Sequence, residues 1–311
     1  MGMLTVTLNP CVDKSIMVSR AVRGRFNQGR AAGDVAGGKG LNAARMLAKL
    51  GERVRALTLL GGESGKLVAR LVAERDGVEL RPVWVRDRTR TIVTVYEEAA
   101  RRATAYVEPS SEVSGEEGDR LLAAYREALE GVELVACCGS AGQPALDHCY
   151  REMIRLAQAR GMLTILDSYG EAFRLGLEAG PDLVKPNVAE CEQWLGESLP
   201  AEADWWRAMR ALQGAGAGAV CLSLGRRGAL LGQGEQEWRL RSPRVRTVNP
   251  VGSGDCLVAG LAYGMVRGWP LVEGAILGVA AGAANAAVWE AAGMQTQQVY
   301  ALRKRVHVEY R

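Results

Sequence analysis

The stretch Asn249-Pro250-Val251-Gly252-Ser253-Gly254-Asp255 leads directly into the apolar run 256–261. Proline and glycine in this order predict a tight turn that feeds the first turn of a buried helix. The backbone amides of Gly252, Ser253 and Gly254 would then lie at the positive end of that helix, where they can bind an anionic oxygen. Asp255 places a carboxylate in the same turn.

Two interpretations of this stretch are open on its own residues. A donor site for anionic oxygen beside a carboxylate suits phosphoryl transfer to a hydroxyl group, because Asp255 can accept the hydroxyl proton. Alternatively, the glycines form an ordinary connection, and Asp255 is an acidic residue that the helix dipole favours at a helix start. The choice depends on the rest of the chain.

Length and composition predict a globular α/β protein. The chain has 311 residues, of which 48% are hydrophobic and 24% are charged, so a substantial core is expected and extended disorder is excluded. The formal net charge is +4 without a cluster of Lys and Arg. We therefore expect neither nucleic acid nor a membrane as a partner, whereas an anionic substrate would suit this charge.

The cysteine and histidine content argues against disulfides and metal clusters. Seven cysteines are present without a C-x-x-C pair, and the only histidines are His148 and His307. We expect the cysteines to be small buried residues of a protein in the reducing cytoplasm. The amino terminus has no signal-peptide pattern, and the apolar segment 275–289 is too short to span a bilayer and reads as a tightly packed buried helix.

Short apolar runs alternate with helical patterns along most of the chain. Such unalternating runs, separated by helices, predict a mainly parallel sheet that is covered on both faces. We expect strands at 4–8, 54–60, 134–138, 163–167, 183–185 and 219–224, and helices at 65–74, 145–160, 171–177 and 188–195.

Two stretches, 15–35 and 83–107, interrupt this rhythm with alternating, partly polar patterns. We expect them to form a small second sheet that is inserted into the α/β body and can cover a site. In the second stretch, Arg86, Arg88 and Arg90 alternate, so three guanidinium groups would share one face of a strand. Residues 97–102 resemble a charged hairpin tip.

A second glycine-rich segment, Gly37-Gly38-Lys39-Gly40-Leu41-Asn42-Ala43-Ala44-Arg45, precedes a helix that ends near Gly51. Glycines permit close approach of a ligand, while Lys39 and Asn42 offer a cation and an amide for substrate oxygens. Neither this segment nor 61–66 has Walker A spacing, and no dinucleotide-binding G-x-G-x-x-G follows a strand. A Rossmann dehydrogenase is therefore disfavoured.

Three further polar residues have two interpretations each. Asn187 and Glu190 can form a capping box at a helix start, or they can lie near Mg²⁺ and its waters, because Mg²⁺ favours few carboxylates and retained waters. Asp13, which follows Asn9-Pro10, can stabilise a turn or point from a strand end into the crevice where open α/β sheets bind ligands.

Together these segments resemble the ribokinase-like (PfkB) carbohydrate kinases, in the branch that contains 1-phosphofructokinase and tagatose-6-phosphate kinase. Residues 7–13 are similar to the T-L-N-P-x-x-D start of that branch, 37–45 to the first family signature and 249–260 to the second. Further matches follow in order at Thr89-Arg90, Gly139-Ser140, Leu166-Asp167, Lys185-Pro186-Asn187, Glu190 and Ser223-Leu224-Gly225. The resemblance implies a single kinase domain over 1–311. It would have a three-layer α/β/α body with a mainly parallel sheet, and a small β-sheet lid inserted at about 15–35 and 83–107.

The resemblance also implies roles for individual residues. Asp255 would be the general base, and the amides of Gly252, Ser253 and Gly254 would hold the transferring phosphoryl group. ATP would lie along Asn187, Ser223, Gly225 and Gly254. Asn187 and Glu190 would organise Mg²⁺ through water.

For the sugar, the resemblance implies contacts from Asp13, Gly38, Lys39, Asn42 and Ser140. Arg90 would pair with the phosphate already present on a sugar phosphate, since guanidinium geometry suits that group. Because lids of this family often pair, a homodimer through the lid sheet is expected.

The sugar end departs from the family pattern at several positions. Gln28 stands where a basic lid residue is usual, fourteen positions before the signature Asn42, although Arg30 could substitute from the same strand face. The usual G-S-L-P segment contains Ala141-Gly142, and Tyr169 replaces a small residue. The phosphoryl-transfer end has no such departure.

Three hypotheses follow. The first is an ATP- and Mg²⁺-dependent kinase that converts a ketohexose phosphate, tagatose 6-phosphate or fructose 1-phosphate, into a bisphosphate. The second is a kinase of the same fold for an unphosphorylated sugar or a nucleoside, which Gln28 and Tyr169 would allow. The third is a non-catalytic nucleotide or sugar sensor, against which Asp255 argues because a sensor needs no base.

Overall fold

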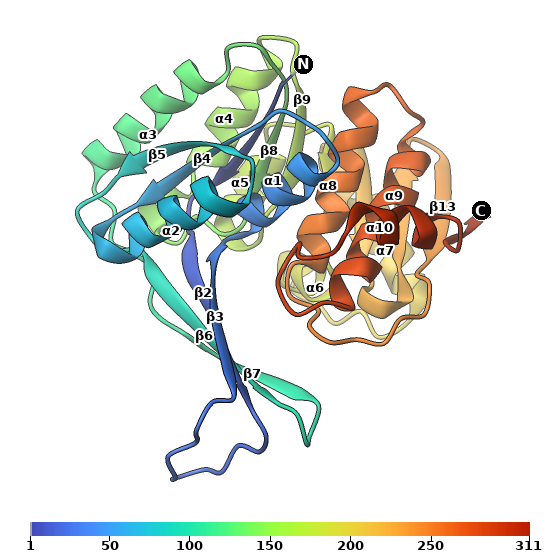
Figure 1. Ribbon diagram of the computed structural model, residues 1–311. Helices are drawn as coiled ribbons and strands as arrows, with labels where there is room; N and C mark the ends of the chain where they lie inside the picture. The colour runs from blue at the N-terminus through green and yellow to red at the C-terminus, as the bar shows by residue number, and fades with distance from the viewer. Residues whose placement is uncertain (1) are drawn as a thin grey trace.

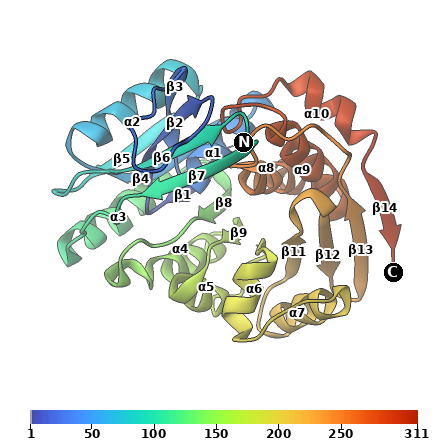
Figure 2. The ribbon, with the colours of Figure 1, turned by 90° about the horizontal axis from the view of Figure 1, so that it is seen from below.

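The computed structural model describes residues 2–311, in which a ten-stranded sheet has the order β14-β13-β12-β11-β10-β9-β8-β1-β4-β5 (Figures 1 and 2). The strands from β11 to β5 are parallel: β1 (Gly2–Thr7), β4 (Val54–Leu60), β5 (Glu79–Trp84), β8 (Val132–Cys138), β9 (Leu163–Asp167), β10 (Leu183–Val184) and β11 (Ala219–Ser223). The antiparallel edge comprises β12 (Ala229–Gln233), β13 (Gln236–Arg241) and β14 (His307–Tyr310).

Helices cover both faces of this sheet, as Figure 2 shows. One face packs against α1 (Lys39–Lys49), α2 (Gly62–Arg75), α8 (Ser253–Val266), α9 (Leu271–Ala286) and α10 (Thr296–Arg303). The other packs against α3 (Gly115–Ala128), α4 (Cys149–Gln158), α5 (Gly170–Leu177), α6 (Val188–Leu195) and α7 (Glu202–Gly214). Each face has its own hydrophobic core. The expected three-layer α/β/α body with a mainly parallel sheet is confirmed.

The predicted strands and helices of the body are present with small changes at their ends. The predicted helix at 145–160 is divided into a 3₁₀ turn, η1 (Pro144–Leu146), and α4. A second 3₁₀ turn, η2 (Gly225–Arg227), follows β11. Gly51 follows the last turn of α1 with a φ of +90°, which is the left-handed conformation expected after a helix end.

The small residues of the segment 275–289 allow α8 and α9 to approach closely. A Cβ atom on Gly260 would lie 2.3 Å from the Cα of Gly278, so a side chain at either position would push the helices apart. The prediction of a tightly packed buried helix is therefore confirmed. Within residues 2–311, none of the helices has the length and apolar character that a membrane span requires.

A smaller sheet with the strand order β3-β2-β6-β7 projects from the body (Figure 1). It comprises β2 (Cys11–Val18), β3 (Ala31–Gly37), β6 (Arg90–Glu97) and β7 (Arg102–Val107). The stretch expected to be strand at 15–35 is interrupted, because residues 19–30 form an exposed connection at the far end of the sheet. We call this sheet the lid.

Three details of the predicted lid are wrong. Arg86 and Arg88 lie in the connection between β5 and β6, so only Arg90 is on a strand. Residues 83–84 belong to β5 of the main sheet. Arg30 was expected on the same strand face as Gln28, but both residues precede β3, and Arg30 pairs with Glu98 at 3.1 Å at the far end of the lid. The turn between β6 and β7 does match the predicted hairpin tip.

Candidate active site

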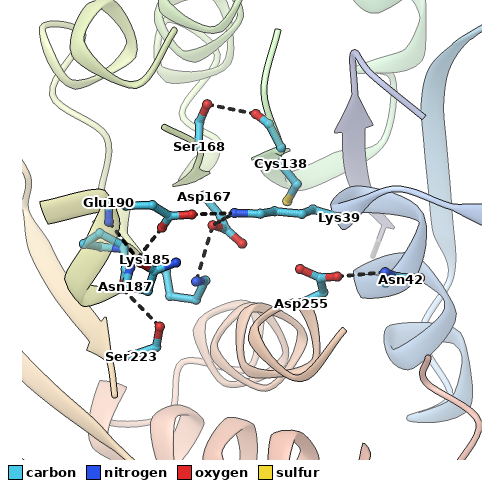
Figure 3. A network of polar contacts seen from close by, with 12 residues as sticks. Lys39, Asn42, Cys138, Asp167, Ser168, Lys185, Asn187, Glu190, Ser223 and Asp255 are labelled. Carbon is cyan, nitrogen blue, oxygen red and sulfur yellow. Dashed lines mark hydrogen bonds and ion pairs between the residues drawn. The ribbon is translucent and has the colours of Figure 1, made fainter. Parts of the chain in front are cut away.

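Asp255 lies in the first turn of α8, and its carboxylate is nearly fully buried. The Asn42 side-chain amide on α1 donates a hydrogen bond of 2.8 Å to Asp255 Oδ2 (Figure 3). Burial, reinforced by the negative charge of Asp167, raises the pKa of Asp255 to about 6. A carboxylate with a pKa near the working pH is well suited to accept a proton.

The turn before Asp255 presents backbone amides toward the same region. Gly252 precedes α8 with a φ of +83°, a conformation in which glycine is favoured. In the part of the chain that the structure describes, the amides of Gly252 and Gly254 have no backbone partner, whereas the Ser253 amide donates to the Pro250 carbonyl at 3.1 Å. The free amides at the positive end of α8 form a site for an anionic oxygen.

Two lysines and two carboxylates form a partly buried cluster beside this turn (Figure 3). Lys39 Nζ lies 3.0 Å from both Asp167 Oδ1 and Glu190 Oε1, and Lys185 Nζ lies 3.3 Å from Asp167 Oδ1. Burial alone would lower the pKa of Lys39, but the carboxylates of Asp167, Glu190 and Asp255 outweigh it and hold that pKa above its usual range. Lys39 is therefore a fixed cation.

Asn187 and Glu190 form the expected capping box of α6. The Asn187 amide N–H donates to Glu190 Oε2, and the Glu190 amide donates to Asn187 Oδ1, both at 2.9 Å. The capping interpretation is therefore confirmed. It leaves Glu190 Oε1 free to contact Lys39, so capping does not exclude a further role.

A cavity of about 1200 Å³ joins the α8 turn to the antiparallel edge of the sheet. Its lining includes the expected nucleotide residues Asn187, Ser223, Gly225 and Gly254, together with Lys39, Glu190, Ser253 and Asp255. Lys185, Arg226, Arg227 and Arg244 add positive charge to its wall. The cavity is large enough for a nucleotide-sized ligand and has the charge to bind an anionic one.

The expected sugar residues lie around the root of the lid. Arg90 begins β6 and donates to the Asn9 carbonyl at 3.3 Å, while the Asn9 side chain donates to Ser140 Oγ at 3.1 Å. Asp13 lies inside the lid strand β2, not at the end of the first strand as expected, and burial raises its pKa. Gly38 precedes α1, where a Cβ would lie 2.7 Å from the Thr7 methyl.

Comparison with known proteins identifies the family of this chain. Residues 6–296 match the family described as pfkB family carbohydrate kinase. The chain belongs to the pfkB family. It is 35% identical over 280 residues to the 1-phosphofructokinase of Rhodobacter capsulatus, an alignment that covers 89% of this chain and 87% of that protein.

Solved structures described as phosphofructokinases share the fold. Phosphofructokinase-2 from Escherichia coli, in complex with substrates and products, superposes with a TM-score of 0.89 at 27% identity, over 98% of this chain and 99% of that one. A Thermotoga maritima protein described as a possible 1-phosphofructokinase gives a TM-score of 0.91 at 24% identity, with both chains fully covered, and bears on the fold alone. The ribokinase-like fold and the phosphotransferase class with an alcohol acceptor are therefore established.

For this pfkB kinase, the structure also contains polar residues that the sequence did not single out as site residues. Asp167 and Lys185 join the lysine–carboxylate cluster, and Asp167 Oδ2 is buried without a hydrogen-bond partner among residues 2–311. Arg45, which is part of the first signature, donates to Asn42 Oδ1 at 3.1 Å. The signals available for Asp167 were its place in the matched pair Leu166-Asp167 and its position at the end of a buried strand, since such ends face the ligand crevice.

Proposed function

We propose that this pfkB kinase transfers the γ-phosphoryl group of ATP to a hydroxyl of a ketohexose phosphate, fructose 1-phosphate or tagatose 6-phosphate, to give a bisphosphate. The observation that carries the proposal is the buried carboxylate of Asp255 beside the free amides of Gly252 and Gly254. A base and an anion site are thereby held within one helical turn.

Asp255 would accept the proton of the attacking hydroxyl, and its pKa of about 6 keeps it ionised but basic at neutral pH. Asn42 fixes one carboxylate oxygen and leaves the other for the substrate. The amides of Gly252 and Gly254 would bind the transferring phosphoryl oxygens. Lys185 would add a charge there, since its Nζ lies 3.5 Å from where a Gly254 Cβ would be.

Mg²⁺ fits this site if waters and phosphates supply most of its ligands. Residues 2–311 contain no cluster of three or more His, Cys, Asp or Glu side chains arranged to hold a metal. Mg²⁺ usually retains several waters and is held by one or two carboxylates together with substrate phosphates. Glu190, Asn187 and the unpartnered Asp167 Oδ2 could hold those waters, and the ion would neutralise phosphate charge.

Arg90 is the residue that favours a phosphorylated sugar. Its Nε is buried without a hydrogen-bond partner among the described residues, which is unfavourable for a guanidinium group. A phosphate oxygen would supply the missing acceptor. The 1-phosphofructokinase name of the curated relative is consistent with such a substrate. The alternative substrate is an unphosphorylated sugar or a nucleoside. Two residues favour it: Gln28, which carries no charge, and the half-exposed Tyr169.

The lid would also pair two chains. The strand β7 is exposed along its whole length, and Phe26 and Tyr106 expose large apolar side chains at the lid. An exposed strand edge with apolar neighbours favours association with a second copy.

The substrate can be tested with phosphorylated and free ketohexoses in a coupled assay of ADP release. Arg90→Ala should lower kcat/KM for the sugar phosphate by about 10- to 100-fold, the cost of one or two charged hydrogen bonds, and should leave the free sugar unaffected. Arg88→Ala is the matched control, because Arg88 is exposed and its guanidinium group pairs with the surface residue Glu108. An equal loss with both sugars would exclude Arg90 as the phosphate contact and support the alternative.

A further inference from the structure

The guanidinium group of Arg45 is buried, with 4% of the residue exposed, on the same face of α1 as Asn42. It forms a bidentate ion pair with Asp76 at the end of α2: Nε lies 2.6 Å from Oδ1, and Nη2 lies 2.8 Å from Oδ2. Asp76 is itself 8% exposed. This geometry fixes the plane of the guanidinium group.

The same guanidinium group fixes the orientation of the Asn42 side chain. Arg45 Nη1 donates to Asn42 Oδ1 at 3.1 Å, and Asn42 Nδ2 donates to Asp255 Oδ2 at 2.8 Å. Arginine has only donors, so Asn42 must turn its oxygen toward Arg45. Its amide nitrogen then has to face Asp255. Without Arg45, a rotated amide would present its oxygen to the carboxylate and repel it.

The two remaining donors of Arg45 reach the lid strand β3 and the segment that follows α9. Nη2 donates to the Ala36 carbonyl at the root of the lid strand β3, at 2.8 Å. Nη1 donates to the Ala291 carbonyl at 3.2 Å. Ala291 packs directly on Gly252, because a Cβ on that glycine would lie 2.9 Å from the Ala291 Cβ. Every N–H group of the Arg45 guanidinium therefore has an acceptor within the protein.

We propose that Arg45, held by Asp76, is a positioning residue that orients Asn42 and thereby sets the direction of the Asp255 carboxylate toward the acceptor hydroxyl. The proposal rests on the proposed role of Asp255 as the base. It extends that role to Arg45 and Asp76, which act on Asp255 only through Asn42.

Arg45→Lys tests the proposal with little change in charge. A lysine keeps the cation beside Asp76 but cannot reach Asp76 and Asn42 together, since it lacks the planar fork. We expect kcat at saturating substrates to fall by about 10- to 100-fold, the scale of a small misplacement of a reacting group. The KM for ATP should stay unchanged, because the nucleotide cavity does not include Arg45.

A second variant separates positioning from folding. Arg45→Met combined with Asp76→Leu replaces the buried ion pair by apolar side chains, an exchange that often preserves stability. It should fold and still show the low kcat. The triple variant with Asn42→Ala should lose no more kcat, relative to the parent, than Asn42→Ala alone, because both changes remove the same contact to Asp255. Leu47→Ala is the control: Leu47 is fully buried on α1, so its loss destabilises the fold without touching Asn42.

The outcomes distinguish this inference from the proposed function. Parental kcat in a folded Arg45→Lys enzyme, or full additivity with Asn42→Ala, would overturn the positioning role. So would a loss of kcat in Leu47→Ala as large as that in Arg45→Lys. Asp255→Asn, assayed alongside, decides the proposed function separately: if it retains turnover, Asp255 is not the base, whatever the Arg45 variants do.

Discussion

Asp255 is a carboxylate that the protein keeps in an unfavourable environment. Its pKa is about 6 against 3.8 for an ordinary aspartate, so the ionised form costs the folded state about 3 kcal/mol at neutral pH. The cost arises chiefly from burial and from the charge of Asp167. Only the ionised form of Asp255 is destabilised. The cost is therefore absent at pH values below 3.8, the ordinary pKa, and is fully present at pH values above about 6, the pKa in the folded protein.

Asp255→Asn should therefore lower activity and raise stability at once. We expect kcat to fall by about 10²- to 10⁴-fold, the usual contribution of a positioned base, with little change in ATP binding. The free energy of unfolding at neutral pH should rise by up to about 3 kcal/mol, and the gain should shrink as the pH falls through about 6. Urea unfolding at two pH values would check this. A less stable Asp255→Asn protein would show that the charge is better compensated than its pKa indicates.

The pH dependence of turnover should report the same group. Because Asp255 must be ionised to accept a proton, kcat/KM should decline as the pH falls through about 6. The substrate phosphate also titrates near this pH, so a control is needed. The Asn42 hydrogen bond lowers the pKa of Asp255, and its removal in Asn42→Ala should shift the decline to higher pH. A decline that does not move would be assigned to the substrate.

Single residues could be predicted from the sequence where they belong to a local motif. Lys39, Asn42 and Asp255 were expected near one another, and the hydrogen bond and the cavity bring them together. The partnership of Arg45 with Asp76 was not foreseen, because Asp76 lies at the end of the next helix, 31 residues further along the chain. Long-range pairing of this kind depends on packing, which local patterns do not encode.

At the scale of elements, the turn before α8 depends on glycine. Gly252 has a φ of +83°, and a Cβ there would also lie 2.9 Å from the Ala291 Cβ. Gly268, beyond the other end of α8, has a φ of +65° but open space around it. These two glycines share the left-handed conformation and differ in their surroundings.

Gly252→Ala and Gly268→Ala form a matched pair. Both should lose about 1–3 kcal/mol of stability from the strained backbone, with Gly252→Ala at the upper end because of the clash. Only Gly252→Ala should also lose turnover, since the clash displaces the amides next to Asp255. Urea unfolding and steady-state kinetics on both variants would check this. Equal activity in the two would mean that the turn does not bind the phosphoryl group.

The sequence predicted two parts of the chain poorly: the antiparallel edge of the main sheet and the connection into the lid. The strands β12, β13 and β14 were not expected, because they form the antiparallel edge of the sheet after the parallel series ends. Arg86 and Arg88 occupy alternate positions and imitate one face of a strand, yet the Asp87 carboxylate accepts from the amides of Arg88 and Glu112 and holds a bend there. Side-chain hydrogen bonds of aspartate stabilise such turns locally.

At the scale of the whole molecule, the sheet order explains why distant segments meet. The strands β1, β8, β9, β10 and β11 are neighbours, and their carboxyl ends carry Asn9, Ser140, Asp167, Lys185 and Ser223. The rhythm of strands and helices predicted this edge, because parallel strands all end on the same side. The rhythm of strands and helices did not predict how far the lid projects, because the far end of the lid lies well away from the body (Figure 1).

The exposed lid leads to a prediction about assembly. Phe26 is fully exposed, and Tyr106 on β7 is 64% exposed, so the chain alone leaves large apolar side chains in water. We expect the parent protein to sediment as a homodimer. Phe26→Ser combined with Tyr106→Ser should shift it to monomer and lower kcat/KM for the sugar substrate, because an unpaired lid closes less readily over the site.

Tyr310→Ser is the matched control for this prediction, because Tyr310 is 68% exposed but lies on β14, at the opposite edge of the main sheet from the strands that adjoin the lid. It should leave both the sedimentation coefficient and the turnover unchanged. A parent protein that is monomeric, or a lid variant that remains dimeric, would contradict pairing through the lid. A monomeric lid variant with full activity would separate the two effects, since it would show that each chain closes its own lid without a partner.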